Sequence, residues 1–283
     1  MKVLVTGGKG QLGQSIKKIA GLYPDVSFEY TDVEELDITN KEAISRYFEE
    51  KGFTHLVNCA AYTAVDKAEE DSSFANLLNA TAVGYLSQVC EMNNCMFIHI
   101  STDYVFDGKN FKPYKESDPM KPESAYGKTK AGGEQEALKN CNKAFVIRTS
   151  WLYSEFGNNF LKTILRLSSE RDKLTIVADQ IGTPTYATHL AKAIMELIIN
   201  EAKSSSSIYH FSNEGVASWY DFALEIVNSS GNNCEVLPIP TEAYPLPARR
   251  PYYSVMSKDL FSNTFDYKIP HWKDGLHECL KLI

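Results

Sequence analysis

Short apolar runs alternate with longer segments of helical apolar spacing along the first 150 residues. We predict strands at 2–8, 26–31, 54–62, 95–102 and 143–153, and helices at 11–22, 40–52, 72–94 and 124–138. Strands that are apolar throughout are typical of a parallel sheet with helices on both faces. The pattern therefore predicts an α/β protein with a doubly wound parallel Rossmann sheet.

The pattern changes after residue 150. Helices are still predicted at 158–169, 187–200 and 219–230, but shorter strands and a proline-rich loop at 237–251 separate them. We therefore predict a first domain over 1–150, with returning segments around 180–210. A smaller α/β lobe is expected mainly over 151–283.

Composition narrows the classes of function. The chain has 283 residues, of which 43% are hydrophobic and 23% charged, as in soluble globular proteins. Its net charge of −7 argues against nucleic acid as a partner, and its apolar stretches fall short of the about 20 residues of a membrane span. The six cysteines form no C-x-x-C pair and no zinc pattern. They predict reduced thiols and a cytoplasmic protein.

The first predicted strand runs directly into a glycine loop, "TGGKGQLG", and then into a helix. Gly7, Gly10 and Gly13 recur at every third position. Glycines between a strand and a helix allow a pyrophosphate to approach the free N–H groups of the helix. An ordinary strand-to-helix turn is the alternative, and this context makes it the weaker one. The first domain is therefore predicted to bind NADH or NADPH.

Further cofactor contacts are expected at the ends of the next two strands. Asp32 follows Gly13 by 19 residues, a position from which a carboxylate binds the adenosine ribose. It would repel a 2′-phosphate and so favours NADH, although nearby lysines could compensate. Asp37 and Ile38 could contact the adenine. The small residues of "AAYT" (Ala60, Ala61, Tyr62 and Thr63) would let the cofactor cross the sheet edge.

A candidate catalytic group follows the fourth strand. Thr102 and Asp103 stand at the end of that strand, and Tyr126 and Lys130 share one face of the next helix. Beside a nicotinamide, Thr102 would hold a substrate carbonyl and Tyr126 would deliver a proton. Lys130 would bind the nicotinamide ribose and lower the pKa of Tyr126. Each residue alone has an ordinary structural explanation, and only their combination points to a carbonyl reductase.

These motifs resemble the extended short-chain dehydrogenase/reductase superfamily, and within it the dTDP-4-dehydrorhamnose reductases. The blocks that carry the resemblance span nearly the whole chain: "GQLG", "NCAAYTAVDKAE", "LLNATAV", "STDYVFDG", "YGKTKAGGE", "RTSWLY", "NNFLKTILRL" and "DQIGTPT". The resemblance implies NAD(P)H-dependent reduction of the 4-keto group of dTDP-4-dehydro-β-L-rhamnose, the last step of dTDP-L-rhamnose synthesis for polysaccharides.

The resemblance also implies roles for single residues. Thr102, Tyr126 and Lys130 would be catalytic. The substrate would contact Thr102, Asp103 and Trp151, and Arg250 of "RRPYYS" would bind its diphosphate. The implied cofactor contacts are Gly7, Gly10, Gln11, Leu12, Asp32, Asp37, Ile38, Ala60, Ala61, Tyr62, Thr63, Tyr126 and Lys130. Asn79 could support Lys130, although a capping or core-polar role fits it as well.

Some positions depart from the family. Some bacterial members form a magnesium-bridged dimer through an acidic residue just after the glycine loop, but this chain has Gln14 and Ser15 there. We therefore predict no metal, and either a monomer or a homodimer. The extra Arg249 and the bulky Tyr252 and Tyr253 mean that the conformation of the "RRPYYS" loop is not predicted from the family pattern.

Two other functions remain possible from the sequence. One is a nucleotide-sugar epimerase or dehydratase, which Asp103 beside Thr102 would also suit. The other is a non-catalytic binding protein like the regulatory subunit of methionine adenosyltransferase, which resembles these reductases. The intact Thr102, Tyr126 and Lys130 set weighs against the second.

Overall fold

The computed structural model describes residues 1–49, 51–204 and 206–283. Its largest sheet has six strands in the order β10-β5-β4-β3-β1-β2, and every neighbouring pair is parallel. The strands are β1 (Lys2–Thr6), β2 (Ser27–Thr31), β3 (His55–Asn58), β4 (Met96–Thr102), β5 (Ala144–Thr149) and β10 (Ile208–His210). Their parallel pairing explains why the inner strands are largely apolar on both faces, whereas β2 at the edge is partly exposed and contains Ser27 and Glu29.

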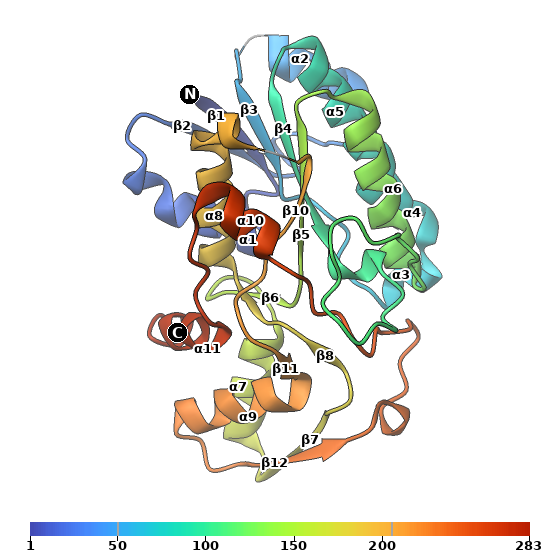
Figure 1. Cartoon of the computed structure of the whole chain (residues 1–283), viewed down its shortest axis with the longest axis vertical. Coiled ribbons are helices and arrows are strands. Elements are labelled where there is room, and N and C mark those ends of the chain that lie inside the picture. Colours follow the sequence, from blue (N-terminus) through green and yellow to red (C-terminus); the bar gives the residue numbers. More distant parts are fainter. Residues whose placement is uncertain (50, 205) are drawn as a thin grey trace.

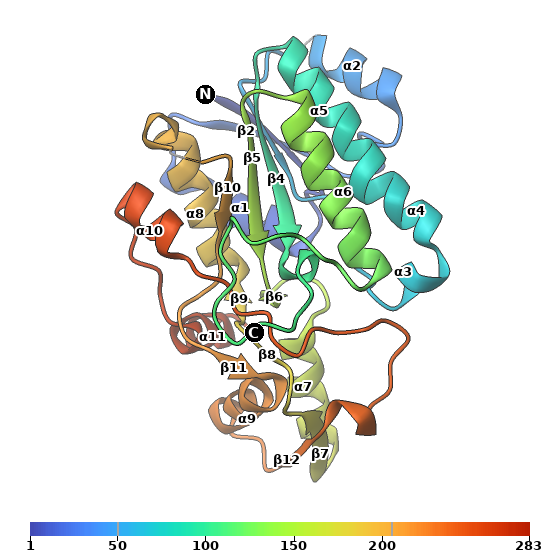
Figure 2. The ribbon, with the colours of Figure 1, turned by 45° about the vertical axis from the view of Figure 1, so that its right-hand side comes forward.

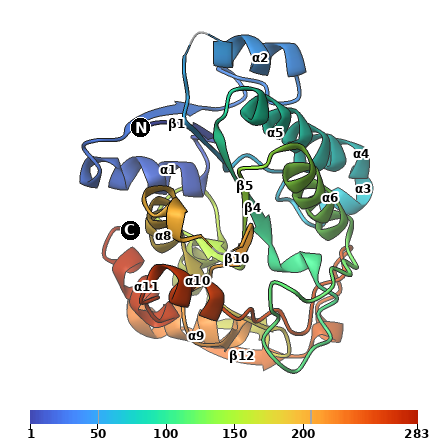
Figure 3. The same cartoon turned by 45° about the horizontal axis from the view of Figure 1, so that its top comes forward.

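Helices cover both faces of this sheet (Figure 3). One face packs against α1 (Gln11–Ile19), α8 (Ala187–Ile199) and α10 (Asp259–Phe265), and the other against α2 (Lys41–Glu49), α5 (Ala82–Met92) and α6 (Ala125–Asn140). Side chains alternate along each strand, so Val3 and Val5 of β1 enter the first core and Leu4 enters the second. The prediction of a doubly wound parallel sheet is confirmed.

The strand order fixes where a ligand can bind. From β1 the chain moves to β2 on one side and then returns to β3 on the other side. Loops leaving β1 and β3 therefore diverge, and in open α/β sheets the crevice between such loops is the binding site. This crevice lies at the carboxyl ends of the strands.

A second group of elements lies below the sheet in Figure 1, around a core of its own. It contains α7 (Phe160–Glu170), α9 (Trp219–Ser230), α11 (Trp272–Leu280) and the parallel pair β7 (Lys173–Val177) and β12 (Glu235–Ile239). Two further short pairs are β6 (Leu152–Tyr153) with β9 (Thr185–Tyr186), and β8 (Ile181–Gly182) with β11 (Ala217–Ser218). Figure 2 shows the segment between β12 and α10 passing from this group back beside the sheet.

The predicted elements differ from the observed ones mainly where the backbone is irregular. The helix expected at 72–94 divides into α4 (Ser72–Asn76), a π-helical turn (Leu77–Thr81) and α5, and α3 (Lys67–Glu70) precedes it. The strand expected at 143–153 ends at Thr149 because Trp151 has a φ of 47°. The helix expected at 40–52 is observed as α2, and residue 50 lies outside the described residues.

No helix in the described part of the chain has the length and apolarity needed to cross a bilayer. All six cysteines are free thiols.

Candidate functional site

The glycine loop forms one wall of a groove at the carboxyl ends of β1 and β3. Gly7 has a φ of 65°, and a Cβ there would lie 2.7 Å from the backbone nitrogen of Ala60. A side chain is therefore excluded at Gly7 both by the backbone conformation and by the close approach of the next loop. Gly10 is the N-cap residue of α1. The first N–H groups of a helix have no intrahelical partner, so this end of α1 can bind an anion.

The groove has a volume of about 630 Å³. Seven of the residues expected to bind the cofactor line it: Gly7, Gly10, Asp32, Asp37, Ile38, Ala60 and Ala61. Sequence reasoning missed the other lining residues, which are Thr6, Lys9, Val33, Leu36, Thr39, Cys59, Phe74 and Leu78. Phe74 and Leu78 come from the helix that follows β3, where only their apolar character could have pointed to an adenine-sized surface.

The remaining expected cofactor residues are placed differently. Gln11 accepts hydrogen bonds from Ser154 (3.1 Å) and Asn159 (2.9 Å), and Leu12 is buried in the core beneath the sheet. Only the backbone of Gln11 and Leu12 is therefore free to face a pyrophosphate. Tyr62 packs its ring against the edge of Phe74, and Thr63 is exposed on the loop.

Carboxylates dominate the end of β2. Asp32 accepts hydrogen bonds from the backbone N–H groups of Lys9 (3.0 Å) and Val33 (2.9 Å). The ammonium of Lys9 pairs with Glu34 and lies 3.8 Å from Glu35. Three acidic side chains thus surround one cation, and a 2′-phosphate would have to compete with them for Lys9.

Thr102 and Tyr126 meet at the other end of the crevice. The hydroxyl of Thr102, at the end of β4, donates to Oδ1 of Asp103 at 2.9 Å and lies close enough to the Tyr126 phenol to lower its pKa. Tyr126 lies in the first turn of α6, where Ser124 caps the helix by accepting from the N–H of Gly127 at 3.1 Å. A Cβ on Gly127 would lie 2.3 Å from the carbonyl oxygen of Tyr104, so a glycine is needed to bring α6 against the loop after Thr102.

The pKa expected for Tyr126 is wrong. Burial raises the pKa of Tyr126 to about 12, the contact with Thr102 lowers it, and the carboxylate of Asp103 raises it again. Lys130 was expected to lower this pKa, but its ammonium donates to the carbonyl oxygen of Ile100 at 2.6 Å and faces Nε2 of His99 at 3.2 Å. A phenol that stays protonated at neutral pH suits a proton donor.

Asp103 is a buried acid with one free oxygen. Burial raises its pKa to about 6, and among the described residues Oδ2 has no hydrogen-bond partner. A buried polar atom without a partner is costly unless a ligand satisfies it. The hydroxyl of Ser254 lies close enough to the same carboxyl to lower its pKa.

Trp151 follows β5 with a backbone conformation that is rare for a bulky residue, at a φ of 47°. Its indole stacks on that of Trp219, the first residue of α9, with ring centroids 3.6 Å apart and planes at 7°. Both rings are half-buried. The strain at Trp151 is thus held by a tertiary contact that joins the loop after β5 to the second group of elements.

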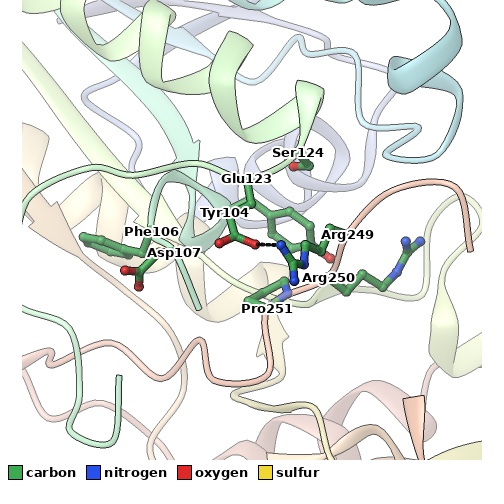
Figure 4. A pocket seen from close by; sticks show the side chains of 8 residues that line it. All are labelled: Tyr104, Phe106, Asp107, Glu123, Ser124, Arg249, Arg250 and Pro251. Carbon is green, nitrogen blue, oxygen red and sulfur yellow. Dashed lines mark ion pairs between the residues drawn. The ribbon is translucent and has the colours of Figure 1, made fainter. Parts of the chain in front are cut away.

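Arg250 lies in the segment between β12 and α10, which passes from the second group of elements back to the sheet. Its guanidinium makes two hydrogen bonds to Asp66, at 2.9 and 2.8 Å, and Asp66 also accepts from the backbone of Ala248. Figure 4 shows Arg250 beside Tyr104, with Arg249 paired to Glu123. In this structure the guanidinium of Arg250, which was expected to bind a diphosphate, is paired with the carboxylate of Asp66.

Asn79 lies in the π-helical turn, and its role differs from support of Lys130. Its side chain accepts from the N–H of Tyr62 at 2.8 Å and donates to the carbonyl oxygen of Tyr62 at 3.0 Å. It also donates to the hydroxyl of Thr129 at 3.1 Å. Asn79 therefore clamps the loop after β3 to α6. The extra residue of a π-helical turn redirects such a side chain, and these turns are frequent at functional sites.

No group of three or more His, Cys, Asp or Glu side chains within the described ranges could hold a metal ion. Ser15 is fully buried, and its hydroxyl donates to the carbonyl oxygen of Gln11.

Comparison with known proteins gives one consistent family. The family model described as the RmlD substrate binding domain matches residues 1–283. A dTDP-4-dehydrorhamnose reductase from Aggregatibacter actinomycetemcomitans is 39% identical, with 97% of each chain covered.

Two solved structures are similar over their whole length. A dTDP-4-dehydrorhamnose reductase from Clostridium acetobutylicum has a TM-score of 0.96 and 41% identity, covering 100% of this chain and 99% of that one. A dTDP-4-dehydrorhamnose reductase from Bacillus anthracis, solved in complex with NADP, has a TM-score of 0.95 and 36% identity over the same shares.

Proposed function

This chain belongs to the family of dTDP-4-dehydrorhamnose reductases, and from that membership we propose how its own residues perform the reaction. The enzyme reduces the 4-keto group of dTDP-4-dehydro-β-L-rhamnose with NADPH or NADH, giving dTDP-L-rhamnose. This is the last step of dTDP-rhamnose biosynthesis, which serves polysaccharide synthesis. A bound nicotinamide cofactor supplies the hydride.

The groove fits such a dinucleotide. Gly7 allows the backbone of the next loop to approach within van der Waals distance, and the N-terminus of α1 faces the same space. Asp32 is placed for ribose hydroxyls, and Ile38, Phe74 and Leu78 offer an apolar surface for adenine. These residues would hold the cofactor across the carboxyl ends of β1 and β3.

Three side chains carry the protein's part of the chemistry. Thr102 would turn its hydroxyl from Asp103 to donate to the carbonyl oxygen, and Tyr126 would donate the proton that converts this oxygen to a hydroxyl. Lys130 would bind the nicotinamide ribose with the N–H that Ile100 and His99 leave free. The single observation that supports this best is the proximity of Tyr126 to Thr102, with the Tyr126 ring packed edge-on against Tyr104, because one carbonyl oxygen could then be reached by both hydroxyls.

The sugar nucleotide would be held by residues of the opposite wall. We assign Oδ2 of Asp103 to a sugar hydroxyl, because that oxygen is buried without a partner among the described residues. Trp151 would pack on the sugar, and Arg250 would bind the diphosphate with the N–H groups that Asp66 leaves free. Residues 1–150, with the segment around 180–210, would thus bind the cofactor, and residues 151–283 mainly the substrate.

The direct test mixes purified protein with NADPH or NADH and the 4-keto sugar nucleotide. We expect one equivalent of reduced cofactor to be consumed per equivalent of dTDP-L-rhamnose formed. Turnover without net consumption of cofactor would indicate an epimerase or dehydratase. Absence of turnover together with tight binding to another enzyme would indicate a non-catalytic subunit.

We also propose that the protein is cytoplasmic, in keeping with its free thiols, and that it acts as a monomer or homodimer. Measurement of its mass in solution decides between these two states.

A further inference from the structure

Lys130 contacts His99, a residue outside the proposed catalytic set of Thr102, Tyr126 and Lys130. The side chain of Lys130 is 1% exposed. An ammonium has three N–H donors. One donates to the carbonyl oxygen of Ile100 and a second faces Nε2 of His99. One donor then remains for the cofactor.

His99 belongs to a polar row that crosses the sheet. In the strand register Thr6 lies opposite Asn58, and Asn58 lies opposite His99. All three are buried, and they stand two residues after Leu4, Leu56 and Phe97, which enter the core on the α5 and α6 face. The row is therefore the last layer of that face before the groove, where polar side chains replace apolar ones.

The row is hydrogen-bonded along its length. The hydroxyl of Thr6 donates to Oδ1 of Asn58 at 2.7 Å, and Nδ2 of Asn58 lies 3.1 Å from Nδ1 of His99. Because an ammonium can only donate, Nε2 must accept when Lys130 is charged, and the ring proton then lies on Nδ1. This tautomer requires the amide of Asn58 to be turned over from its orientation in the structure, so that its oxygen faces Nδ1 of His99 and its NH2 faces Thr6.

The charged groups around Lys130 act in opposite directions. Burial lowers the pKa of Lys130 to about 8, while Glu134 on the same helix and Cys59 at the end of β3 raise it. His99 stays neutral because burial, and then the charge of Lys130, lower its pKa well below the usual value. A neutral acceptor on β4 is thus available to a cation that is otherwise poorly solvated.

We propose that His99 is a positioning residue for Lys130. Its Nε2 accepts one proton of the ammonium and, with the carbonyl oxygen of Ile100, fixes the direction of the remaining donor. With the amide of Asn58 turned over, its oxygen would accept from Nδ1 and keep the ring in the accepting tautomer. This inference rests on the proposed role of Lys130, but the contact itself can be tested without any activity.

The first experiment examines the contact by nitrogen NMR of protein labelled with ¹⁵N-histidine. Lys130→Met removes the ammonium and should shift the Nε2 resonance of His99 more than that of any other histidine. The His99 ring should report Nδ1–H in the wild type and stay neutral from pH 6 to 9. A His99 resonance unmoved by Lys130→Met, or an Nε2–H tautomer in the wild type, would overturn the proposal even if the enzyme is inactive.

The second experiment separates positioning from mere packing. His99→Phe keeps a ring and removes the acceptor, whereas His99→Gln can restore an acceptor. Misplaced catalytic groups cost up to about a hundredfold in rate, so we expect kcat of His99→Phe to fall tenfold to a hundredfold with KM for the sugar nucleotide unchanged. His99→Gln should recover most of this loss.

The pH dependence of kcat separates the two roles further, because a residue that only fills space would not change it. Loss of the acceptor destabilises the ammonium, which lowers the pKa of Lys130, so the alkaline limb of kcat should move to lower pH in His99→Phe. His55→Phe, which replaces another buried histidine of the sheet at the far end of β3, is the control and should leave the limb in place. Equal losses in His99→Phe and His99→Gln, or an unmoved limb, would overturn the proposal. If His99→Phe does not fold, the NMR experiment decides.

Discussion

The groove proposed for the cofactor and the residues proposed for the substrate (Asp103, Trp151 and Arg250, here called the substrate wall) are built in different ways. The groove is formed by three strand-to-loop junctions in which backbone and small residues provide the shape, at Gly7, Asp32 and Ala60. The substrate wall depends on pairs of side chains that come from distant parts of the chain. Arg250 pairs with Asp66, 184 residues away, and Trp151 stacks on Trp219.

This difference has a consequence for function. The groove is lined by residues that follow β1, β2 and β3, so we expect cofactor binding not to depend on the second group of elements. The substrate wall forms only when the sheet and the second group of elements pack together. A ligand could then replace one partner of a pair, such as Asp66 beside Arg250. We therefore expect substitutions in the wall to change substrate affinity while cofactor binding stays intact.

The largest effect on kcat is expected at Tyr126, between the cofactor groove and the substrate wall. Tyr126→Phe removes the proton donor and should lower kcat by about 10²–10⁴-fold, the usual contribution of a general acid. Binding of NADPH, measured by fluorescence titration, should be unchanged. Tyr267→Phe is the control, because burial raises the pKa of Tyr267 to about 12 as well, but Tyr267 packs on the opposite face of the sheet. An active Tyr126→Phe enzyme would remove Tyr126 from the mechanism.

The next effect concerns stability on the substrate wall. The folded pKa of Asp103 is about 6, against an ordinary value of 3.8. A raised carboxyl pKa contributes stability that is present below pH 3.8 and is lost as the pH rises through 6. Two units correspond to about 3 kcal/mol at pH 8.

Asp103→Asn removes this ionisation. The variant should therefore be more stable than the wild type by up to about 3 kcal/mol at pH 8, and by roughly half of that at pH 5. Urea unfolding at both pH values measures the difference. Asp25→Asn, at an exposed acid, should show no such dependence. A pH-independent difference would mean that Asp103 is not strained by burial.

The contrast also explains what could be predicted from the sequence. Strands, helices and the glycine loop are local patterns, so the sheet and the glycine loop followed from spacing. The other groove residues followed from their places after the strands and from the family resemblance. The partners of Lys130 and Arg250 are set by strand order and by docking, which no local pattern encodes. His99 looked like one more residue of an apolar strand, and it became meaningful only once the register placed it beside Asn58.

One error and one alternative that the sequence left open have the same origin. Tyr126 and Lys130 share a helix face, and that spacing suggested that the cation lowers the pKa of the phenol. Burial of the phenol has the larger effect, and burial depends on the packing of Tyr104 and of the loop after β3. Asn79 was placed correctly on its helix, but the π-helical turn directs its side chain to Tyr62.

A smaller effect is expected at Arg250. Arg250→Lys replaces a fork with a point charge, and a hydrogen bond to a charged group contributes about 1.5–3 kcal/mol. KM for the sugar nucleotide should therefore rise about tenfold or more, with NADPH affinity unchanged. Arg249→Lys is the matched control, because Arg249 is exposed and pairs with Glu123. Equal effects of the two substitutions would mean that Arg250 only joins the two regions through Asp66.

The smallest expected effect lies in the groove and concerns the choice of cofactor. Asp32, Glu34 and Glu35 surround Lys9. A 2′-phosphate near Asp32 meets a like charge, whose removal at a partly exposed site is worth about 1 kcal/mol.

Asp32→Ala should therefore shift the ratio of kcat/KM for NADPH and NADH by about fivefold toward NADPH. Asp25→Ala, at the exposed residue preceding β2, should leave the ratio unchanged. KM for the sugar nucleotide should not move in either variant, because Asp32 belongs to the groove alone. A change in substrate affinity in Asp32→Ala would break the separation between the two regions, since it would show that the groove and the substrate wall are coupled through the bound cofactor.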